Sequence, residues 1–123
     1  MNRCLIVDDS EIVRKVARAI IESWKFEVAE AGSGQEALDA CRAQMPDVIF
    51  LDWHLPGSDS IELIKSIRQL GVLKRPYILY CMTEYDAGIL ARATAAGIDD
   101  TISKPFDRNS LTAKFKAIKL AAA

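Results

Sequence analysis

The sequence has little histidine and almost no net charge. Its single histidine, His54, leaves a zinc finger or a histidine-rich metal site without enough ligands. With 16 lysines and arginines against 17 aspartates and glutamates, the formal net charge is −1, so no general attraction to nucleic acid or anionic lipid is expected. We therefore predict neither a nucleic-acid partner nor a membrane partner. Any catalysis has to use carboxylates.

Long hydrophobic runs and paired cysteines are also missing. No apolar stretch reaches the roughly 20 residues that a membrane span requires. The first such stretch, residues 4–7, stops at Asp8 and Asp9, which predicts a strand and not a signal peptide. The three cysteines are odd in number and lack Cys-x-x-Cys spacing, which is typical of buried thiols in a reducing compartment. The sequence thus indicates a cytoplasmic protein.

What the chain does contain is enough apolar material for one domain. Its 123 residues, 50% of them hydrophobic, predict a single folded unit over residues 1–123. Three nearly all-apolar runs do not alternate with polar residues, as is typical of strands buried on both faces of a parallel sheet. These runs are residues 4–7, 48–51 and 77–81. Weaker strand patterns lie at about residues 26–29 and 101–103.

Helical patterns fill the intervals between these strands. Apolar residues at three- and four-residue spacing predict a first helix whose buried stripe includes Ile12, Val16 and Trp24. Ser33 and Glu36 have the form of a capping box that opens a short second helix. Three more helices are predicted over residues 61–70, after a cap at Asp86 and after a cap at Asp107. Strands that alternate with helices in this way predict an α/β fold with a doubly wound parallel sheet.

Polar residues follow four of the predicted strands. They are Asp8 and Asp9 after the first, Asp52 after the third, Thr83 after the fourth and Lys104 after the fifth. The carboxyl ends of parallel strands meet at one edge of the sheet, where ligands bind in open α/β folds. Any one of these aspartates alone can be explained as a cap for the next helix. Their coincidence at one edge favours a functional site.

Three neighbouring carboxylates repel one another unless protonation or a cation relieves the repulsion. Few carboxylates with room for water favour Mg²⁺, which commonly bridges protein oxygens to a phosphate. Lys104 would add a second positive charge, and Thr83 a hydroxyl that can donate to an oxyanion. If Asp52 attacked a phosphorus atom, the product would be an aspartyl phosphate.

In order and spacing, these residues and the pair Lys104-Pro105 resemble the receiver domain of two-component response regulators over nearly the whole chain. Three segments are most similar to chemotaxis-type, CheY-like single-domain regulators. They are Val7-Asp8-Asp9-Ser10, Asp52-Trp53-His54-Leu55-Pro56-Gly57 and Lys104-Pro105-Phe106-Asp107. The resemblance implies a five-stranded flavodoxin-like sheet with strand order 2-1-3-4-5.

The resemblance also implies the ligands of a metal ion. Asp52 matches the phosphoacceptor, and Asp8 and Asp9 match the acidic pair that holds Mg²⁺ with it. The backbone carbonyl of His54 matches the last protein ligand of that ion. Its side chain is expected to face solvent without a catalytic role. Trp53, beside it, is expected to be a packing residue.

Further roles follow from the same resemblance. Thr83 matches a hydroxyl residue that shifts toward the phosphoryl group, and Lys104 a lysine that pairs with that group. Pro105 is expected to follow a cis peptide bond, as in relatives.

Two positions depart from the family pattern. Thr101 stands where relatives usually carry Tyr or Phe, a ring that turns inward on activation, so the usual aromatic switch is missing. Glu84 stands where relatives often have a small residue, and its carboxylate is expected to overhang the pocket and slow turnover. A solvated carboxylate without effect is the alternative. Tyr85 is a candidate for a partner surface around the fourth predicted helix.

The preferred hypothesis is a monomeric binding module that is switched by phosphorylation. A sensor histidine kinase would phosphorylate Asp52, and the domain would be no enzyme beyond its own phosphorylation and dephosphorylation. Because no helix-turn-helix or enzyme domain follows, output is expected through a protein target such as a flagellar motor switch component.

Two alternatives remain open. An aspartate-nucleophile phosphohydrolase uses a similar sheet, but such enzymes carry a second Asp two residues after the nucleophile, where this chain has His54. A pseudo-receiver would bind partners or a nucleotide without phosphorylation, a reading that Thr101 and Glu84 favour.

Overall fold

The computed structural model describes residues 2–122 as a parallel five-stranded sheet in the order β2-β1-β3-β4-β5. The strands are β1 (Arg3–Val7), β2 (Glu27–Ala31), β3 (Val48–Asp52), β4 (Tyr77–Met82) and β5 (Asp100–Ser103). The helices are α1 (Glu11–Glu22), α2 (Gly34–Ala43), α3 (Ser60–Leu70), α4 (Ala87–Ala96) and α5 (Arg108–Ala122). The predicted fold class and strand order are thereby confirmed. Among the described residues, none of the helices combines the length and the apolar character that crossing a membrane needs.

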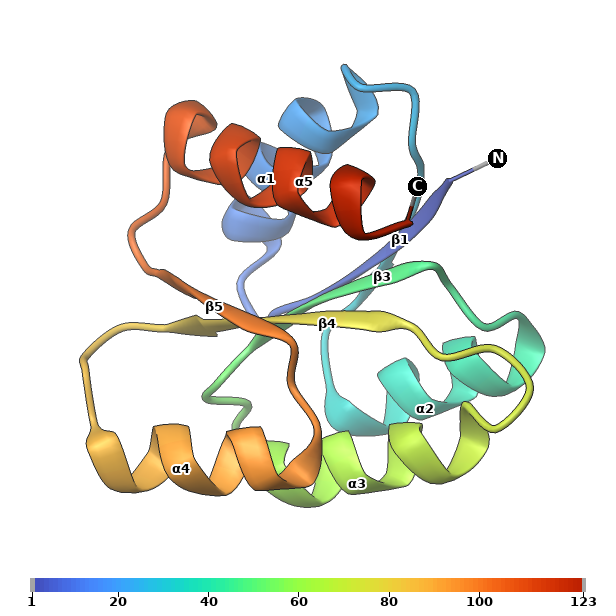
Figure 1. Ribbon diagram of the computed structural model, residues 1–123, viewed down its shortest axis with the longest axis vertical. Coiled ribbons are helices and arrows are strands. Elements are labelled where there is room, and N and C mark those ends of the chain that lie inside the picture. Colours follow the sequence, from blue (N-terminus) through green and yellow to red (C-terminus); the bar gives the residue numbers. More distant parts are fainter. Residues whose placement is uncertain (1, 123) are drawn as a thin grey trace.

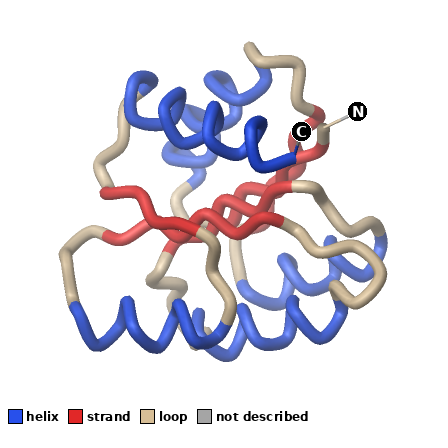
Figure 2. The backbone as a smooth tube through the Cα atoms, viewed as in Figure 1, coloured by secondary structure: helices blue, strands red, loops and turns tan. Residues whose placement is uncertain are grey.

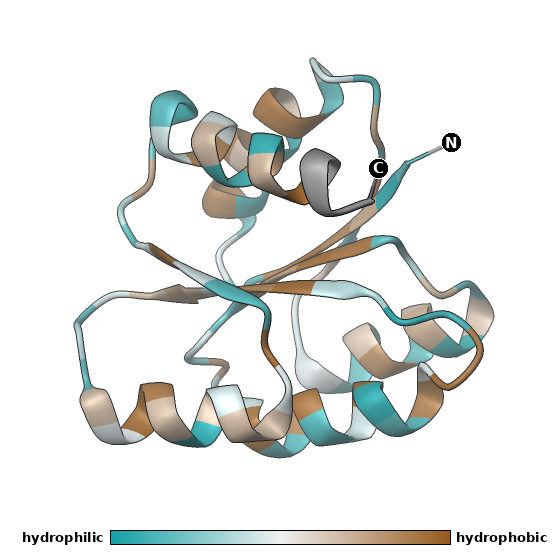
Figure 3. Ribbon diagram, in the orientation of Figure 1, coloured by the Kyte–Doolittle hydropathy of each residue, from teal (hydrophilic) through white to brown (hydrophobic). Residues whose placement is uncertain are grey.

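The sheet lies between two layers of helices (Figure 1; Figure 2). Helices α1 and α5 cover one face, and α2, α3 and α4 cover the other. Alternate residues of the central strands feed two separate cores: Leu5 and Ile49 belong to the core under α2 to α4, and Ile6 and Phe50 to the core under α1 and α5. Figure 3 shows the hydrophobic stretches of the central strands between these layers. Burial on both faces explains why these strands read as unbroken apolar runs.

Side chains begin most helices where the sequence predicts a cap. The N–H of Glu36 donates to Ser33 Oγ at 3.2 Å, and the N–H of Ile89 donates to Asp86 Oδ1 at 3.0 Å. Asp107 accepts from the N–H of Ser110 at 2.7 Å. Each such bond satisfies a backbone donor that the helix leaves free. Two further caps that the sequence analysis did not single out are Ser10 at α1 and Asp59 at α3.

The predicted buried stripe of the first helix is wrong at two residues, because Ile12 and Val16 are 75% and 49% exposed. Trp24 lies in the turn after α1 but packs against the core under α1 and α5, as expected of this stripe. The buried face of α1 instead passes through Ala17 and Ile21. Since successive residues turn by about 100°, Val16 lies to one side of a face centred on Ala17. The helix therefore presents apolar side chains to solvent in its first two turns.

Candidate functional site

The residues predicted from the strand ends lie together around one cleft. Asp52 ends β3, Asp8 and Asp9 follow β1, Thr83 follows β4 and Lys104 follows β5. The cleft has a volume of about 310 Å³. Its walls are formed by Asp9, Asp52, Trp53, His54, Thr83, Glu84 and Lys104. The parallel register thus gathers groups that are distant in the sequence, as expected from the topology.

Three carboxylates lie together here, two of them on the wall of the cleft. Asp8, Asp9 and Asp52 each offer an oxygen atom, and these oxygens all lie within 4.8 Å of one another. Asp8 and Asp52 are buried, with 4% and 5% of their surface exposed, while Asp9 is open to solvent. The buried Oδ1 of Asp52 has no hydrogen-bond partner in the described part of the chain. A buried carboxylate oxygen in that state needs an external partner.

Lys104 reaches the two buried carboxylates from β5. Its Nζ donates to Asp8 Oδ2 at 3.0 Å and lies 3.5 Å from Asp52 Oδ2. The other oxygen of Asp8 accepts from the backbone N–H of Ser10 at 2.9 Å. The peptide bond between Lys104 and Pro105 is cis, as predicted. One ammonium group therefore pairs with two of the three clustered carboxylates.

The pKa values of Asp52 and Lys104 reflect the charges around them. Burial raises the pKa of the Asp52 carboxyl to about 6, and the nearby charge of Asp8 adds to this effect against the opposing charge of Lys104. Burial lowers the pKa of the Lys104 ammonium, but the hydrogen bond to Asp8 and the charge of Asp52 outweigh it, so that this pKa is raised. Lys104 consequently stays charged at neutral pH and only partly relieves the carboxylates.

The donor set fits a hard divalent cation such as Mg²⁺. Such an ion takes carboxylate and carbonyl oxygens and retains waters, for which the open cleft has room. Asp8, Asp9 and Asp52 would supply the carboxylates, and Oδ1 of Asp52, which has no partner among the described residues, can serve as a ligand atom. His54, whose backbone carbonyl is the fourth predicted ligand, lines the same cleft.

Trp53 has a polar role that the sequence analysis missed. Its indole Nε1 donates to Thr83 Oγ1 at 3.1 Å, although its ring also packs against the core under α2 to α4. With one lone pair of Thr83 occupied, the hydroxyl hydrogen remains free to donate into the cleft. The pairing of β3 with β4 brings these two residues together, so the sequence around either residue does not predict the contact.

The remaining predicted residues divide between the cleft and the surface beside it. Glu84 is exposed on the cleft wall, where its carboxylate was expected, and Tyr85 is 81% exposed but does not line the cleft. Thr101 is half-buried and, with Pro105, lines a separate hollow along β5 and α5. Its register partner on β4 is Tyr80, whose ring is buried. An aromatic ring is thus present on β4, next to the position on β5 that lacks one.

The Tyr80 ring is held in place by a hydrogen bond. Its phenol oxygen lies 2.6 Å from Ser60 Oγ at the start of α3, and both residues are buried. The ring is therefore fixed between β4 and α3.

Comparisons with known proteins agree with this geometry. The family model of the response regulator receiver domain matches residues 4–116. Among solved structures, the chemotaxis protein CheY4 of Vibrio cholerae has a TM-score of 0.89 at 28% identity, covering 96% of this chain and 98% of its own.

Curated relatives include transcriptional regulators. The phosphate regulon transcriptional regulatory protein PhoB of Rhizobium meliloti is 34% identical over 96% of this chain and 52% of its own length. The KDP operon transcriptional regulatory protein KdpE of Escherichia coli is 34% identical over 94% of this chain and 50% of its own. The chain thus spans about half the length of these relatives. By its sequence, its fold and the match over residues 4–116, this chain belongs to the response regulator receiver domain family.

Proposed function

We propose that Asp52 accepts a phosphoryl group in the presence of Mg²⁺ and that the phosphorylated domain signals by changing its contacts with a protein. The observation that carries this proposal is the state of Asp52. It is a buried carboxylate with a pKa raised to about 6 and one oxygen that has no partner among the described residues, and it lies beside a lysine and two further carboxylates at the edge of an open cleft.

The chemistry is an in-line displacement. An oxygen of Asp52 attacks the phosphorus atom of the donor, and the bond from phosphorus to the leaving group breaks with its electron pair going to that group. Above pH 6 the carboxyl is mostly ionised and able to attack. Lys104 pairs with the incoming oxygens, and the hydroxyl of Thr83 donates to one of them. When bound, Mg²⁺ neutralises charge on the transferring oxygens.

The phosphodonor that we propose is a sensor histidine kinase. Ile12 and Val16 are exposed on the first two turns of α1, which begins two residues after Asp9. An apolar surface beside the acidic pair supports docking of a protein donor. The domain acts as a monomer in the cytoplasm, a setting that the three free buried cysteines support. It catalyses only its own phosphorylation and dephosphorylation.

The output that we propose is contact with a protein. The likeness to CheY4 supports chemotaxis or motility, with a flagellar motor switch component as the target. The similarity to PhoB and KdpE supports a second setting, the control of transcription. In both settings the phosphorylated receiver domain acts by contacting another protein.

Incubation with acetyl phosphate and Mg²⁺, followed by intact-mass measurement, tests the proposal. The wild type should gain one phosphoryl group, and Asp52→Asn should gain none, because an amide cannot act as the carboxylate nucleophile. Absence of any gain in the wild type would instead identify a pseudo-receiver. Continuous release of phosphate from small phosphate esters would identify a phosphohydrolase.

A further inference from the structure

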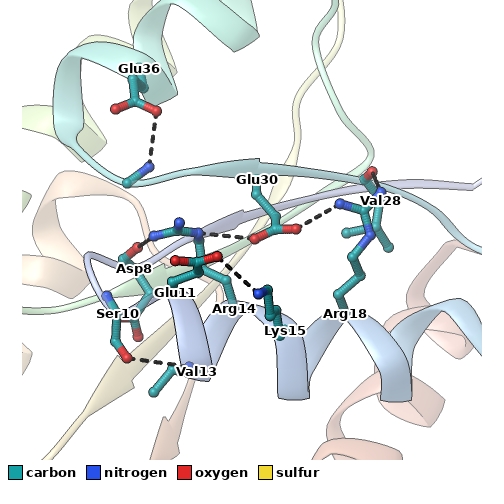
Figure 4. Close-up of polar contacts among 11 residues, drawn as sticks. Asp8, Ser10, Glu11, Val13, Arg14, Lys15, Arg18, Val28, Glu30 and Glu36 are labelled. Carbon is teal, nitrogen blue, oxygen red and sulfur yellow. Dashed lines mark hydrogen bonds and ion pairs between the residues drawn. The ribbon is translucent and has the colours of Figure 1, made fainter.

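Arg14, Arg18 and Glu30 form a charged cluster beside the cleft and line none of its walls. Arg14 on α1 lies between the end of β1 and the neighbouring strand β2 (Figure 4). Its Nη1 donates to the backbone carbonyl of Asp8 at 2.7 Å, and its Nε donates to Glu30 Oε1 at 3.0 Å. Only 18% of its side chain is exposed. The guanidinium thus links the acidic turn to the sheet.

Glu30 is itself held by a second arginine. Its Oε2 accepts from Arg18 Nη1 at 2.6 Å, and Arg18 also donates to the carbonyl of Val28 at 3.1 Å. The hydrogen bond from Arg18 lowers the pKa of the Glu30 carboxyl, so the carboxylate stays ionised near neutral pH. Glu30 therefore presents Arg14 with a fixed acceptor and restricts where the guanidinium can lie (Figure 4).

The contact with Arg14 completes the fixation of Asp8. The backbone N–H of Asp8 donates to the carbonyl of Ala31 at 3.1 Å, so both backbone groups of this residue are bonded. Its carboxylate accepts from Ser10 and Lys104. With its backbone held on two sides, Asp8 has little freedom to move, and the turn that carries it and Asp9 is restricted with it.

Arginine suits this position better than lysine. The planar guanidinium reaches two acceptors in different directions, the Asp8 carbonyl and Glu30, whereas an ammonium is a single point at the end of a flexible stem. Gly32 leaves room for it, since a Cβ atom there would lie 3.3 Å from Arg14 Nη1. Both geometry and space are thus matched to arginine.

We propose that Arg14, oriented by Glu30, is a positioning residue for the divalent cation. It fixes the turn that carries Asp8 and Asp9 so that their oxygens converge with those of Asp52. This inference rests on the proposed function of the site, because it assumes that a cation binds there.

The test is the Mg²⁺ dissociation constant of the folded protein, measured by NMR from backbone amides around the cleft. Arg14→Ala should raise this constant by about tenfold, as is typical when the group that orients a metal ligand is lost. Arg14→Lys should raise it nearly as much, because the charge remains but the double contact is lost. Glu30→Gln should have a smaller effect in the same direction.

Lys15→Ala is the matched control. It removes one positive charge from the next position of the same helix, where Lys15 forms an exposed ion pair with Glu11. Its dissociation constant should stay within about twofold of the wild-type value. If Arg14→Lys or Arg14→Ala binds Mg²⁺ as well as the wild type, the inference is wrong, even where the urea midpoint falls. If the wild type itself binds no Mg²⁺, the proposed function fails first.

Discussion

The two ends of the sheet hold partly buried charges in opposite ways. At the amino ends of the strands, Arg68 donates to Asp99 Oδ2 at 2.9 Å and to the carbonyls of Gly97 and Pro76, both at 2.6 Å. Asp99 in turn accepts from the N–H of Ile78 at 2.8 Å. This cluster ties α3 to β4 and to the turn after α4.

At the carboxyl ends the charges are not balanced. Lys104 pairs with Asp8 and Asp52 next to a third carboxylate, Asp9, and one buried oxygen of Asp52 has no partner among the described residues. The amino-end cluster satisfies its own groups and stabilises the fold. The carboxyl-end cluster leaves a buried carboxylate oxygen that protonation or a bound cation can satisfy, as is common at functional sites. Four predictions sharpen this comparison.

The largest effect is expected for Arg68→Ala. This change removes the donor to the carbonyls of Gly97 and Pro76 and leaves Asp99, only 17% exposed, with Arg75 as its one remaining arginine partner among the described residues, so it should lower the free energy of unfolding by about 3 kcal/mol. Arg75→Ala removes another partner of Asp99 whose side chain is 58% exposed, and should cost less than about 1 kcal/mol. Urea denaturation measures both. Equal losses would show that the amino-end cluster is not specially stabilising.

Asp52→Asn should stabilise the protein at alkaline pH. Because the folded state raises the pKa of Asp52 to about 6, ionisation is less favourable there than in the unfolded chain. The penalty is absent below the ordinary pKa of about 4, grows as pH rises and is complete above about 6. In the absence of Mg²⁺ the variant should therefore gain on the order of 2 kcal/mol at pH 8 and almost nothing at pH 4. A gain that did not depend on pH would contradict this origin.

Trp53→Phe keeps an aromatic ring but removes the N–H that donates to Thr83. We expect phosphorylation by acetyl phosphate to slow about fivefold, which corresponds to one hydrogen bond of about 1 kcal/mol. Trp24→Phe is the control, because Trp24 packs on Phe115, with ring centroids 5.2 Å apart, and lies on no wall of the cleft. If the two variants were phosphorylated at equal rates, the hydrogen bond from Trp53 would have no role in positioning Thr83.

The smallest effect is expected at Glu84. Its exposed carboxylate repels an anionic donor across the cleft wall, so Glu84→Ala should speed phosphorylation by small donors a few-fold at low salt and less at high salt.

Thr101→Ala should alter activation little, because no ring-sized side chain is lost. Amide exchange with a beryllofluoride mimic should show altered protection in residues 83–86. An unchanged loop, or a strong loss of response in Thr101→Ala, would contradict this account.

The sequence predicts a strand closely where its hydrophobic pattern allows only one interpretation. The unbroken apolar runs locate β1, β3 and β4 closely, because burial on both faces leaves no polar positions. The edge strand β2 was predicted at residues 26–29 but spans Glu27–Ala31. Its half-exposed pattern includes Glu30, which obscures the bounds. Patterns of one-sided burial are weaker guides than continuous runs.

The contacts of the site also divide into those that the sequence predicts and those that it does not. The strand-end rule brings Asp52 and Lys104 together from the sequence alone, because parallel topology decides the meeting. The contacts of Trp53 with Thr83 and of Arg14 with Asp8 depend on how far side chains reach between separate elements. Such contacts follow from the packed structure and leave no pattern along the chain.

The most direct test is the free energy of unfolding at pH 8 as Mg²⁺ is titrated. A ligand that binds only the folded state stabilises it, so the wild type should become more stable as Mg²⁺ rises. Asp9→Ala, which removes an exposed carboxylate, and Asp52→Asn should show little or no increase. Equal increases in all three proteins would mean that the ion acts elsewhere, and would contradict the claim that the carboxyl-end cluster is incomplete without a cation.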